Sequence, residues 1–248
     1  MSEPCLLPAA STSVKRTAAL RHDVVVVVPM YNEAQVVATV VSDLRSAFSR
    51  VVCVDDGSSD GSATSAELAG ATVVRHPLNL GQGAALQTGI QYALDSSASY
   101  VVTFDADGQH RVADAVAMLD LARATEVDVV LGSRFLHRST DPSMPALRRH
   151  VLRGALLFTR LTTGLPLTDT HNGLRVLSRS AARRITITLH GMAHASEILA
   201  IIAREKISYV EAPISVDYTE YSTAKGQSSL NAVNILFDLF LARARNAP

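Results

Sequence analysis

Short apolar runs alternate with amphipathic segments through the first half of the chain. The run VVVVVPM at 24–30 is continuous and β-branched, which is typical of a strand buried on both faces of a sheet. The segment 32–48 that follows carries its apolar residues at helical spacing. The same order recurs, with expected strands within 50–62, 72–76, 100–108 and 127–134 and expected helices at 62–70, 81–96 and 112–124. Strict alternation of strands and helices predicts an α/β fold with a mainly parallel sheet.

The second half of the chain is more basic and has longer polar loops. A basic amphipathic helix is expected at 144–164 and another helix at 194–206. The other expected elements are a polar loop with a short strand within 167–179, a strand pair or extended segment at 207–220, a loop at 223–229 and a terminal helix at 230–245. No long linker and no internal repeat interrupts this order. We therefore expect a flexible tail at 1–22, a single domain at 23–229 and a C-terminal amphipathic helix at 230–248.

The composition indicates a globular protein and narrows its class. Hydrophobic residues make up 48% of the 248 residues, charged residues 19%, and the formal net charge is zero. This balance provides no general attraction for nucleic acid. Cys5 and Cys53 are too few for a disulfide framework and lack metal-site spacing, so we expect a cytoplasmic location. The sequence has neither a signal-peptide pattern nor an apolar run of about eighteen residues, so any membrane contact is expected to be peripheral.

Polar clusters follow three of the expected strands. These are PMYNE at 29–33, DDGSSDGS at 55–62 and DADGQH at 105–110. In an open α/β sheet, ligands bind beyond the carboxyl ends of the strands. A single cluster of this kind is often ordinary turn chemistry, because Asp, Gly and Ser are turn residues. Three clusters at the same edge of one sheet favour a binding site.

Asp105 and Asp107 stand one residue apart at the end of an expected strand, and Gln109 follows. Oxygen ligands of this kind select hard cations such as Mg²⁺ or Mn²⁺, which keep open positions for phosphate oxygens. A cation held there can neutralise a diphosphate as it leaves. The alternative is an Asp-rich turn without metal, in which the two carboxylates would repel each other and shift their pKa values.

Four stretches, VVVPMYNEAQVV, VVCVDDGSSDGS, NLGQGAALQTG and VTFDADGQH, together resemble the family 2 glycosyltransferases, which have the GT-A fold. Within that family, LGSRF, RRHVLRGA and DTHNGLRVLSR are similar to the polyprenyl-phosphate (dolichyl-phosphate) sugar synthases. The resemblance covers about residues 24–229. It implies a Rossmann-like nucleotide-binding sheet, with a nucleotide-sugar half at 23–134 and an acceptor half at 135–229. It also implies a metal-dependent inverting hexosyltransferase that uses Mg²⁺ or Mn²⁺ and a UDP-, GDP- or dTDP-hexose.

The resemblance assigns candidate site residues by position. Nucleotide contacts are implied for Pro29, Tyr31, Glu33, Asp56, Gly57, Gly81, Gln82, Gly83 and Asp105. The implied metal ligands are Asp105, Asp107 and Gln109. Catalytic roles are implied for Asp107, Arg134, Arg149 and Glu197. Arg148 is an equal candidate with Arg149 for the acceptor phosphate.

The chemical nature of the substrate that accepts the sugar determines which residues of the second half would take part in the transfer. A sugar hydroxyl needs a general base, whereas a lipid phosphate is already anionic and needs cations to position it. Arginines suit a phosphate, although a basic run is also typical of a solvated surface. The arginines in question are Arg134, Arg138, Arg148, Arg149, Arg153 and Arg160. Glu197 is the candidate base for a saccharide hydroxyl, although a glutamate on a helix face is more often structural.

Two segments depart from the polyprenyl-phosphate pattern. In THNGL, His171 and Asn172 are candidates for hydrogen bonds to a sugar. In YTEYSTAKGQSS, Lys225 and Gly226 are candidates for a mobile loop over the diphosphate. These departures leave the acceptor open between a lipid phosphate and a saccharide.

We predict transfer of a hexose to a polyprenyl phosphate, with transfer to a saccharide hydroxyl in polysaccharide or glycoconjugate synthesis as the first alternative. A nucleotidyltransferase would need a glycine-rich, lysine-bearing loop after the first strand, which PMYNEAQ lacks. A non-catalytic sugar-nucleotide sensor would not need Asp105, Asp107 and Arg134 together. The apolar terminal helix is expected to dock on the core; the alternative is contact with a membrane surface or a small membrane partner.

Overall fold

The computed structural model describes residues 20–136, 154, 159–170, 172–189, 191 and 193–217. In this part of the chain, seven strands form one sheet in the order β3-β2-β1-β4-β6-β5-β7. Only β6 runs antiparallel to its neighbours, β4 and β5. The strands are β1 Arg21–Met30, β2 Phe48–Asp55, β3 Thr72–Arg75, β4 Tyr100–Thr103, β5 Val129–Ser133, β6 Arg175–Ser178 and β7 Tyr209–Pro213. The mainly parallel α/β sheet expected from the sequence is confirmed.

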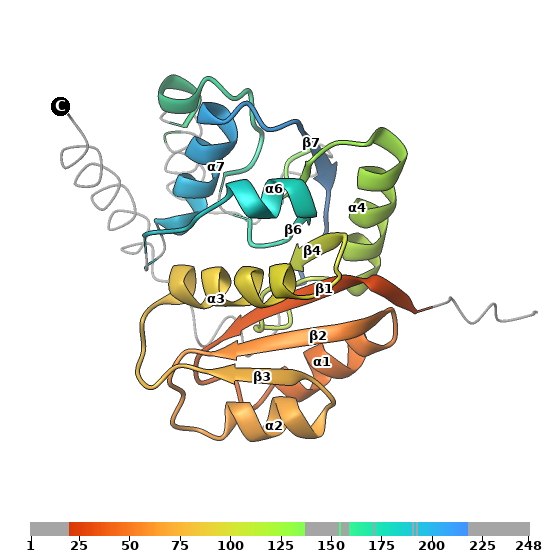
Figure 1. Ribbon diagram of the computed structural model, residues 1–248, viewed down its shortest axis with the longest axis vertical. Coiled ribbons are helices and arrows are strands. Elements are labelled where there is room, and N and C mark those ends of the chain that lie inside the picture. The colour runs from red at the N-terminus through yellow and green to blue at the C-terminus, as the bar shows by residue number, and fades with distance from the viewer. Residues whose placement is uncertain are drawn as a thin grey trace, which may run out of the picture.

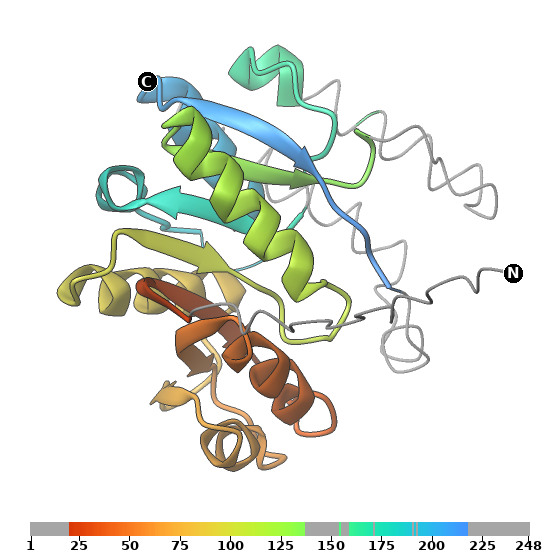
Figure 2. The ribbon, with the colours of Figure 1, turned by 90° about the vertical axis from the view of Figure 1, so that its right-hand side faces the viewer.

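Helices cover both faces of this sheet, which gives three layers (Figure 1). One face packs against α1, α2 and α4, and Figure 2 shows α1 and α4 lying across it. The other face packs against α3, α6 and α7. The helices are α1 Val37–Arg45, α2 Ser62–Leu68, α3 Gln82–Asp95, α4 Val112–Thr125, α6 Arg179–Arg184 and α7 His194–Arg204.

The continuous apolar run of β1 follows from its place inside this sandwich. Val24, Val26 and Val28 belong to the core under α1 and α4. Val25 and Val27 belong to the core under α3 and α7. Because successive side chains of a strand point to opposite faces, a strand covered on both sides needs an apolar residue at every position.

Gly89 lets α3 lie close to β1. A Cβ atom at Gly89 would come within 2.2 Å of Cγ1 of Val27. Only a glycine fits at that distance, so the position fixes how deeply α3 packs on the sheet. The N-terminus of α3 lies at the carboxyl edge of the strands, because Gly81 and Gln82 line the same cavity as the three polar clusters.

The second half of the chain differs from its predicted elements in three respects. The short strand expected within 167–179 is β6, and it inserts antiparallel between β4 and β5. The short helix α6 was not predicted; its N-cap is Ser178, whose Oγ accepts a hydrogen bond from the backbone N–H of Ala181 at 3.1 Å. The described part of 207–220 forms the single strand β7. Most of the helix expected at 144–164, and all of the one expected at 230–245, lie outside the described residues.

Two element boundaries in the first half also differ from those predicted. The strand β1 begins at Arg21, so the last two residues of the expected tail belong to the sheet. The helix α1 spans Val37–Arg45 and not 32–48, because the chain first makes a turn in which the Val36 N–H donates to the Glu33 carbonyl.

Candidate active site

A cavity of about 380 Å³ opens at the carboxyl edge of the sheet. All three polar clusters contribute to it, as their positions in the sequence predicted. Its described lining comprises Pro29, Met30, Tyr31, Glu33, Asp56, Asn79, Gly81, Gln82, Ala85, Asp105, Ala106, Asp107, Asn172, Gly173, Arg175, His194 and Ala195. Eight of the predicted nucleotide- or metal-binding residues therefore share one cavity: Pro29, Tyr31, Glu33, Asp56, Gly81, Gln82, Asp105 and Asp107.

Asp56 is a buried carboxylate held rigidly in the cavity wall. Its Oδ1 accepts hydrogen bonds from Nδ1 of His76 at 2.8 Å and from the Leu80 N–H at 2.9 Å. Its Oδ2 accepts from the Gly81 N–H at 2.7 Å. The other ring nitrogen of His76 lies 3.0 Å from Oγ1 of Thr88 in α3. These contacts fix the orientation of the Asp56 carboxylate, which can accept hydrogen bonds from a ligand in the cavity.

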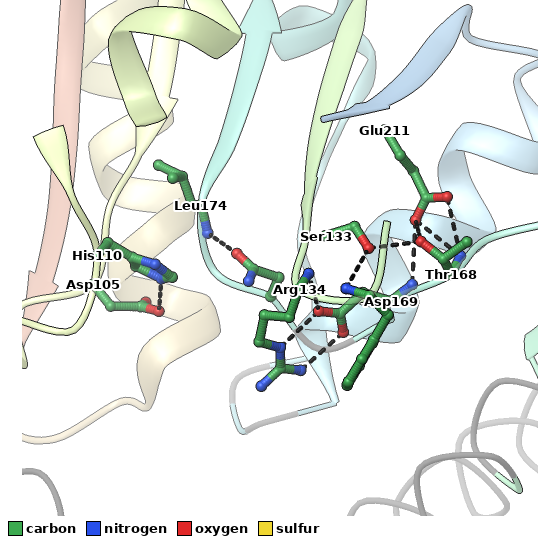
Figure 3. Close-up of polar contacts among 10 residues, drawn as sticks. Asp105, His110, Ser133, Arg134, Thr168, Asp169, Leu174 and Glu211 are labelled. Atoms are coloured by element: carbon green, nitrogen blue, oxygen red, sulfur yellow. Dashed lines mark hydrogen bonds and ion pairs between the residues drawn. The ribbon is translucent and has the colours of Figure 1, made fainter. Parts of the chain in front are cut away.

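Asp105 stands at the end of β4 and is held from two sides. Its Oδ1 accepts from Nε2 of Gln82 at 3.3 Å. Its Oδ2 accepts from Nε2 of His110 at 3.1 Å (Figure 3). Burial alone would raise the pKa of Asp105. The His110 hydrogen bond and the positive charge of Arg175 outweigh burial and hold this pKa below its usual range. Asp105 is therefore an ordered, ionised carboxylate.

The pKa of Asp107 is shifted in the opposite direction to that of Asp105. Burial raises its pKa, and the negative charge of Asp105 raises it further. Its Oδ1 accepts a hydrogen bond from the Gln109 N–H at 3.0 Å. A carboxylate in this position is stabilised by a cation, so the residues present fit a divalent metal ion.

The donor set for such an ion is incomplete within the described part of the chain. No three His, Cys, Asp or Glu side chains gather there as a metal cluster. Gln109, the predicted third ligand, does not line the cavity, and its backbone carbonyl accepts from the Asp217 N–H at 2.9 Å. Asp105 and Asp107 would then hold the ion together with oxygens of water or substrate. The ligand role of Gln109 stays a prediction.

Gly57 and Gly83 are not among the described residues that line the cavity. Gly57 has a φ of 78°, and a Cβ there would come within 2.7 Å of the Leu78 backbone. A Cβ at Gly83 would come within 2.1 Å of the Leu189 carbonyl oxygen. Both glycines allow close approach of one chain segment to another. Their direct contact with a nucleotide remains a prediction.

Arg134 follows β5 and forms an ion pair with Asp169 (Figure 3). Its Nε donates to Oδ2 at 2.7 Å and its Nη2 donates to Oδ1 at 2.8 Å. Thr168 and Asp169 donate their backbone N–H groups to the carboxylate of Glu211 in β7. Arg134 is not among the described residues that line the cavity. Its predicted contact with a phosphate stays a prediction.

Glu197 lies on α7 and anchors a loop. Its carboxylate accepts from the backbone N–H groups of Thr188, at 3.0 Å, and Leu189, at 2.8 Å, and from the Thr188 hydroxyl. The same loop carries the Leu189 carbonyl that packs on Gly83. Glu197 does not belong to the described cavity lining. These contacts give Glu197 a structural function that needs no catalytic role. Its role as a general base stays a prediction.

Arg175 lines the cavity, although the sequence pattern assigned it no role. Arg175 is the first residue of the short strand β6. It stands between Leu174 and Val176, which belong to the core, and this alternation is the sequence feature that places its side chain on the opposite face of the sheet. Asn172 and His194 also line the cavity. Burial lowers the pKa of Arg175, and burial together with the charge of Arg175 lowers that of His194 to about 4. His194 is therefore neutral at physiological pH.

Several predicted acceptor-side residues fall outside the described part of the chain. These are Arg138, Arg148, Arg149, Arg153, His171, Lys225 and Gly226. Arg160 is described, and its Nη2 donates to the Leu167 carbonyl at 2.9 Å. None of the described helices combines the length and the apolar character that crossing a membrane requires.

A mainly parallel sheet with an aspartate pair in a cavity at its carboxyl edge is the arrangement that the resemblance to the GT-A glycosyltransferases implies. The fold is shared with the crystal structure of glucosyl-3-phosphoglycerate synthase from Mycobacterium tuberculosis in complex with Mn²⁺, UDP and phosphoglyceric acid. That likeness has a TM-score of 0.63 at 17% identity, over 88% of this chain and 78% of that one. It concerns the fold alone.

The family model described as Glycosyl transferase family 2 matches residues 25–186, and the chain belongs to this family of glycosyltransferases. It is 30% identical over 237 residues to a UDP-N-acetylglucosamine–dolichyl-phosphate N-acetylglucosaminyltransferase of Methanococcus voltae, covering 88% of this chain and 94% of the relative. It is 28% identical over 212 residues to an undecaprenyl-phosphate mannosyltransferase of Micrococcus luteus, covering 82% and 86%. The predicted resemblance to the polyprenyl-phosphate sugar synthases is confirmed.

Proposed function

We propose that this glycosyltransferase moves a hexose from a nucleoside diphosphate sugar to a polyprenyl phosphate, with inversion at the anomeric carbon, at the inner face of a membrane. The observation that supports this proposal is the convergence of Asp56, Asp105 and Asp107 in one cavity at the carboxyl edge of the sheet. A nucleotide, its diphosphate and a sugar need adjoining sites. This cavity offers the rigidly held carboxylate of Asp56 as a hydrogen-bond acceptor, together with the aspartate pair.

Each part of the donor has a suitable partner in this arrangement. Asp56 is oriented to accept a hydrogen bond from the base, while Pro29 and Tyr31 line the adjacent wall. Asp105 and Asp107 would hold Mg²⁺ or Mn²⁺, which when bound neutralises the charge of the diphosphate as the nucleotide leaves. The pKa of Asp107, raised by burial and by Asp105, is the sign of a carboxylate that needs such a cation.

The acceptor is assigned from relatives and from chemistry. Two curated relatives are named for transfer to dolichyl phosphate and to undecaprenyl phosphate. A lipid phosphate is an anionic nucleophile and needs no general base. The candidate base for a saccharide acceptor, Glu197, already accepts hydrogen bonds from Thr188 and Leu189. No observation on the described residues therefore favours the saccharide acceptor.

The first test measures thermal stabilisation by UDP, GDP and dTDP, each with and without Mn²⁺. We expect one nucleotide to stabilise the wild type only with metal and to fail with Asp107→Asn. The matched control is Asp120→Asn, an exposed carboxylate on α4, which should behave as the wild type. The second test measures transfer of radiolabelled hexose from that nucleotide to undecaprenyl phosphate, dolichyl phosphate and a saccharide. Transfer to the saccharide alone would overturn the assigned acceptor.

A further inference from the structure

Arg175 is a buried cation with an unused hydrogen-bond donor at the floor of the cavity. Only 2% of the residue is exposed, and its Nη1 is fully buried without a hydrogen-bond partner among the described residues. The neighbouring residues Leu174 and Val176 point into the core under α4, so Arg175 points to the opposite face, toward α3 and α7. A buried guanidinium nitrogen without a partner is costly, so this position favours a hydrogen-bond acceptor from a bound ligand or an ordered water.

His194 offers the complementary group beside it. Its Nδ1 lies 2.8 Å from the Gly191 carbonyl oxygen, which can only accept, so Nδ1 carries the proton. In the neutral ring Nε2 is then an acceptor, and no described residue bonds to it. The charge of Arg175 acts directly on His194 and on Asp105, which places the guanidinium near both.

Asn172 adds a second donor. Its Oδ1 accepts from the Leu174 N–H at 2.8 Å, a contact drawn in Figure 3, so the side-chain amide is oriented by the backbone. The Nδ2 group is left to donate elsewhere, and Asn172 is buried in the cavity lining, because only 7% of it is exposed. The floor of the cavity thus presents donors from Arg175 and Asn172 and acceptors from His194 and Asp105.

This mixture of donors and acceptors distinguishes between possible ligands. A phosphate offers only acceptors, and here it would face the lone pair of His194 and the carboxylate of Asp105. The charge of Arg175 is also already offset by Asp105 and Asp169, both of which act on it. A sugar hydroxyl donates one hydrogen bond and accepts others, which suits the whole set.

We propose that Arg175, His194 and Asn172 form the subsite that binds the hydroxyl groups of the donor hexose and thereby selects the sugar. Arg175 and Asn172 donate to hydroxyl oxygens, and Nε2 of His194 accepts from a hydroxyl. The position beside Asp105 puts the sugar next to the diphosphate. This inference rests on the proposed function, because it assumes that a nucleoside diphosphate sugar occupies the cavity.

The test compares the affinity for a nucleoside diphosphate with that for its sugar conjugate. Isothermal titration calorimetry with Mn²⁺ uses UDP, UDP-glucose and UDP-N-acetylglucosamine, and GDP with GDP-mannose. The variants are Arg175→Met and His194→Leu. Their matched controls are Arg183→Met and His22→Leu, both at exposed positions. Near-ultraviolet circular dichroism checks that each variant is folded.

We expect Arg175→Met to lose about tenfold or more in affinity for the sugar conjugate beyond any loss for the free diphosphate, since a hydrogen bond to a charged group is worth this much. We expect His194→Leu, which removes a hydrogen bond to a neutral ring, to lose about fivefold for the sugar conjugate while its affinity for the free diphosphate stays within about twofold. The preference between UDP-glucose and UDP-N-acetylglucosamine, or the discrimination of GDP-mannose from GDP, should fall with it. If the Arg175→Met variant does not fold, the His194→Leu variant alone tests the proposed subsite.

Three outcomes would overturn the proposal, and they are distinguishable. Equal losses for the diphosphate and the sugar conjugate would assign these residues to the phosphates. Unchanged affinity for both ligands would show that the subsite lies elsewhere. If the wild type binds none of the nucleotides with Mn²⁺, the proposed function itself fails and the sugar subsite fails with it.

Discussion

Arg134 and Asp169 form a two-pronged ion pair in which the carboxylate is almost completely buried. The pair joins Nε to Oδ2 at 2.7 Å and Nη2 to Oδ1 at 2.8 Å, while 2% of the Asp169 side chain and 22% of the Arg134 side chain are exposed. The backbone of Asp169 is tied in turn to Glu211. The pair therefore fixes the segment after β5 to the loop that leads into β6.

Replacing Asp169 by alanine should destabilise the protein strongly. The change removes the buried carboxylate that accepts two hydrogen bonds from the Arg134 guanidinium, and breaking such a pair costs about 3 kcal/mol. We expect the urea midpoint to fall accordingly. The control is Asp23→Ala, which removes the exposed ion pair with Arg123 and should cost less than about 1 kcal/mol. Equal effects of the two changes would contradict the prediction.

Gly173 should be required for the proposed metal binding because it lies directly against the carboxylate of Asp105. A Cβ at Gly173 would come within 2.1 Å of Oδ2 of Asp105. We therefore expect Gly173→Ala to push this carboxylate aside and to reduce Mn²⁺-dependent stabilisation by nucleotide at least about tenfold in apparent affinity. Gly191→Ala is the matched control, since a Cβ at Gly191 would have no described atom within 4 Å. A Gly173→Ala variant with unchanged metal dependence would remove Asp105 from the metal site.

The first half of the fold could be predicted from sequence because each element there carries a strong pattern. The run 24–30 in β1 is continuously apolar, and the polar clusters at the strand ends identify the edge where Asp56, Asp105 and Asp107 meet. Each cluster was visible as a short stretch of sequence, and the parallel sheet alone brings the clusters together.

In the described part of the second half, β6, α7 and β7 lie where a strand, a helix and a strand were expected, but their contacts were not predicted because contacts depend on topology. The strand β6 has four residues, and nothing in RVLS indicates that it inserts between β4 and β5 in the opposite direction. That insertion carries Arg175 into the cavity floor beside Asp105, from which it is distant in the sequence. The carboxylate of Glu197 likewise meets the backbone of Thr188, a contact that no residue pattern indicates.

The stability of the protein should depend on the protonation of His194. Burial, followed by the charge of Arg175, lowers its folded-state pKa to about 4, whereas the ordinary value is 6.5. Between these values the unfolded chain binds more protons, so the free energy of unfolding falls as pH decreases through this window. The contribution is at most about 3 kcal/mol. The Gly191 hydrogen bond and the charges of Asp105 and Glu197 partly oppose the shift.

The measurement is the difference in urea-unfolding free energy between the wild type and His194→Gln from pH 7.5 to pH 4.5. Titrating groups that do not interact with His194 cancel in this difference. We expect the wild type to lose stability relative to the variant as the pH falls below about 6.5. A difference that does not vary with pH would contradict the burial of a neutral His194.

The thiol of Cys53 should be unreactive in the folded protein. Burial in β2 raises its pKa to about 12, and the negative charge of Asp55 adds to this effect. In a Cys5→Ser background, alkylation by iodoacetamide at pH 8 then reports on Cys53 alone. We expect labelling only at urea concentrations that unfold the protein, since a buried protonated thiol is neither nucleophilic nor accessible. Rapid labelling without urea would show that β2 opens locally.

Glu197→Gln should separate an anchoring role from a catalytic one. The carboxylate accepts from the backbone N–H groups of Thr188 and Leu189, and an amide keeps only one acceptor oxygen. We expect a loss of about 1–2 kcal/mol in unfolding free energy and a lower affinity for the donor sugar, because the same loop packs on Gly83 and leads to His194. The readouts are urea unfolding, the Michaelis constant for the donor and the pH dependence of kcat.

A general base at Glu197 would give a different result from an anchor. The substitution would then reduce kcat by about a hundredfold or more at unchanged stability, and it would remove the acidic limb of the pH profile. Glu67→Gln on α2 is the matched control, because it makes the same change in an exposed carboxylate that pairs with Arg75. An exposed pair of this kind contributes less than about 1 kcal/mol, so the control should leave the Michaelis constant and kcat unchanged and the stability nearly so.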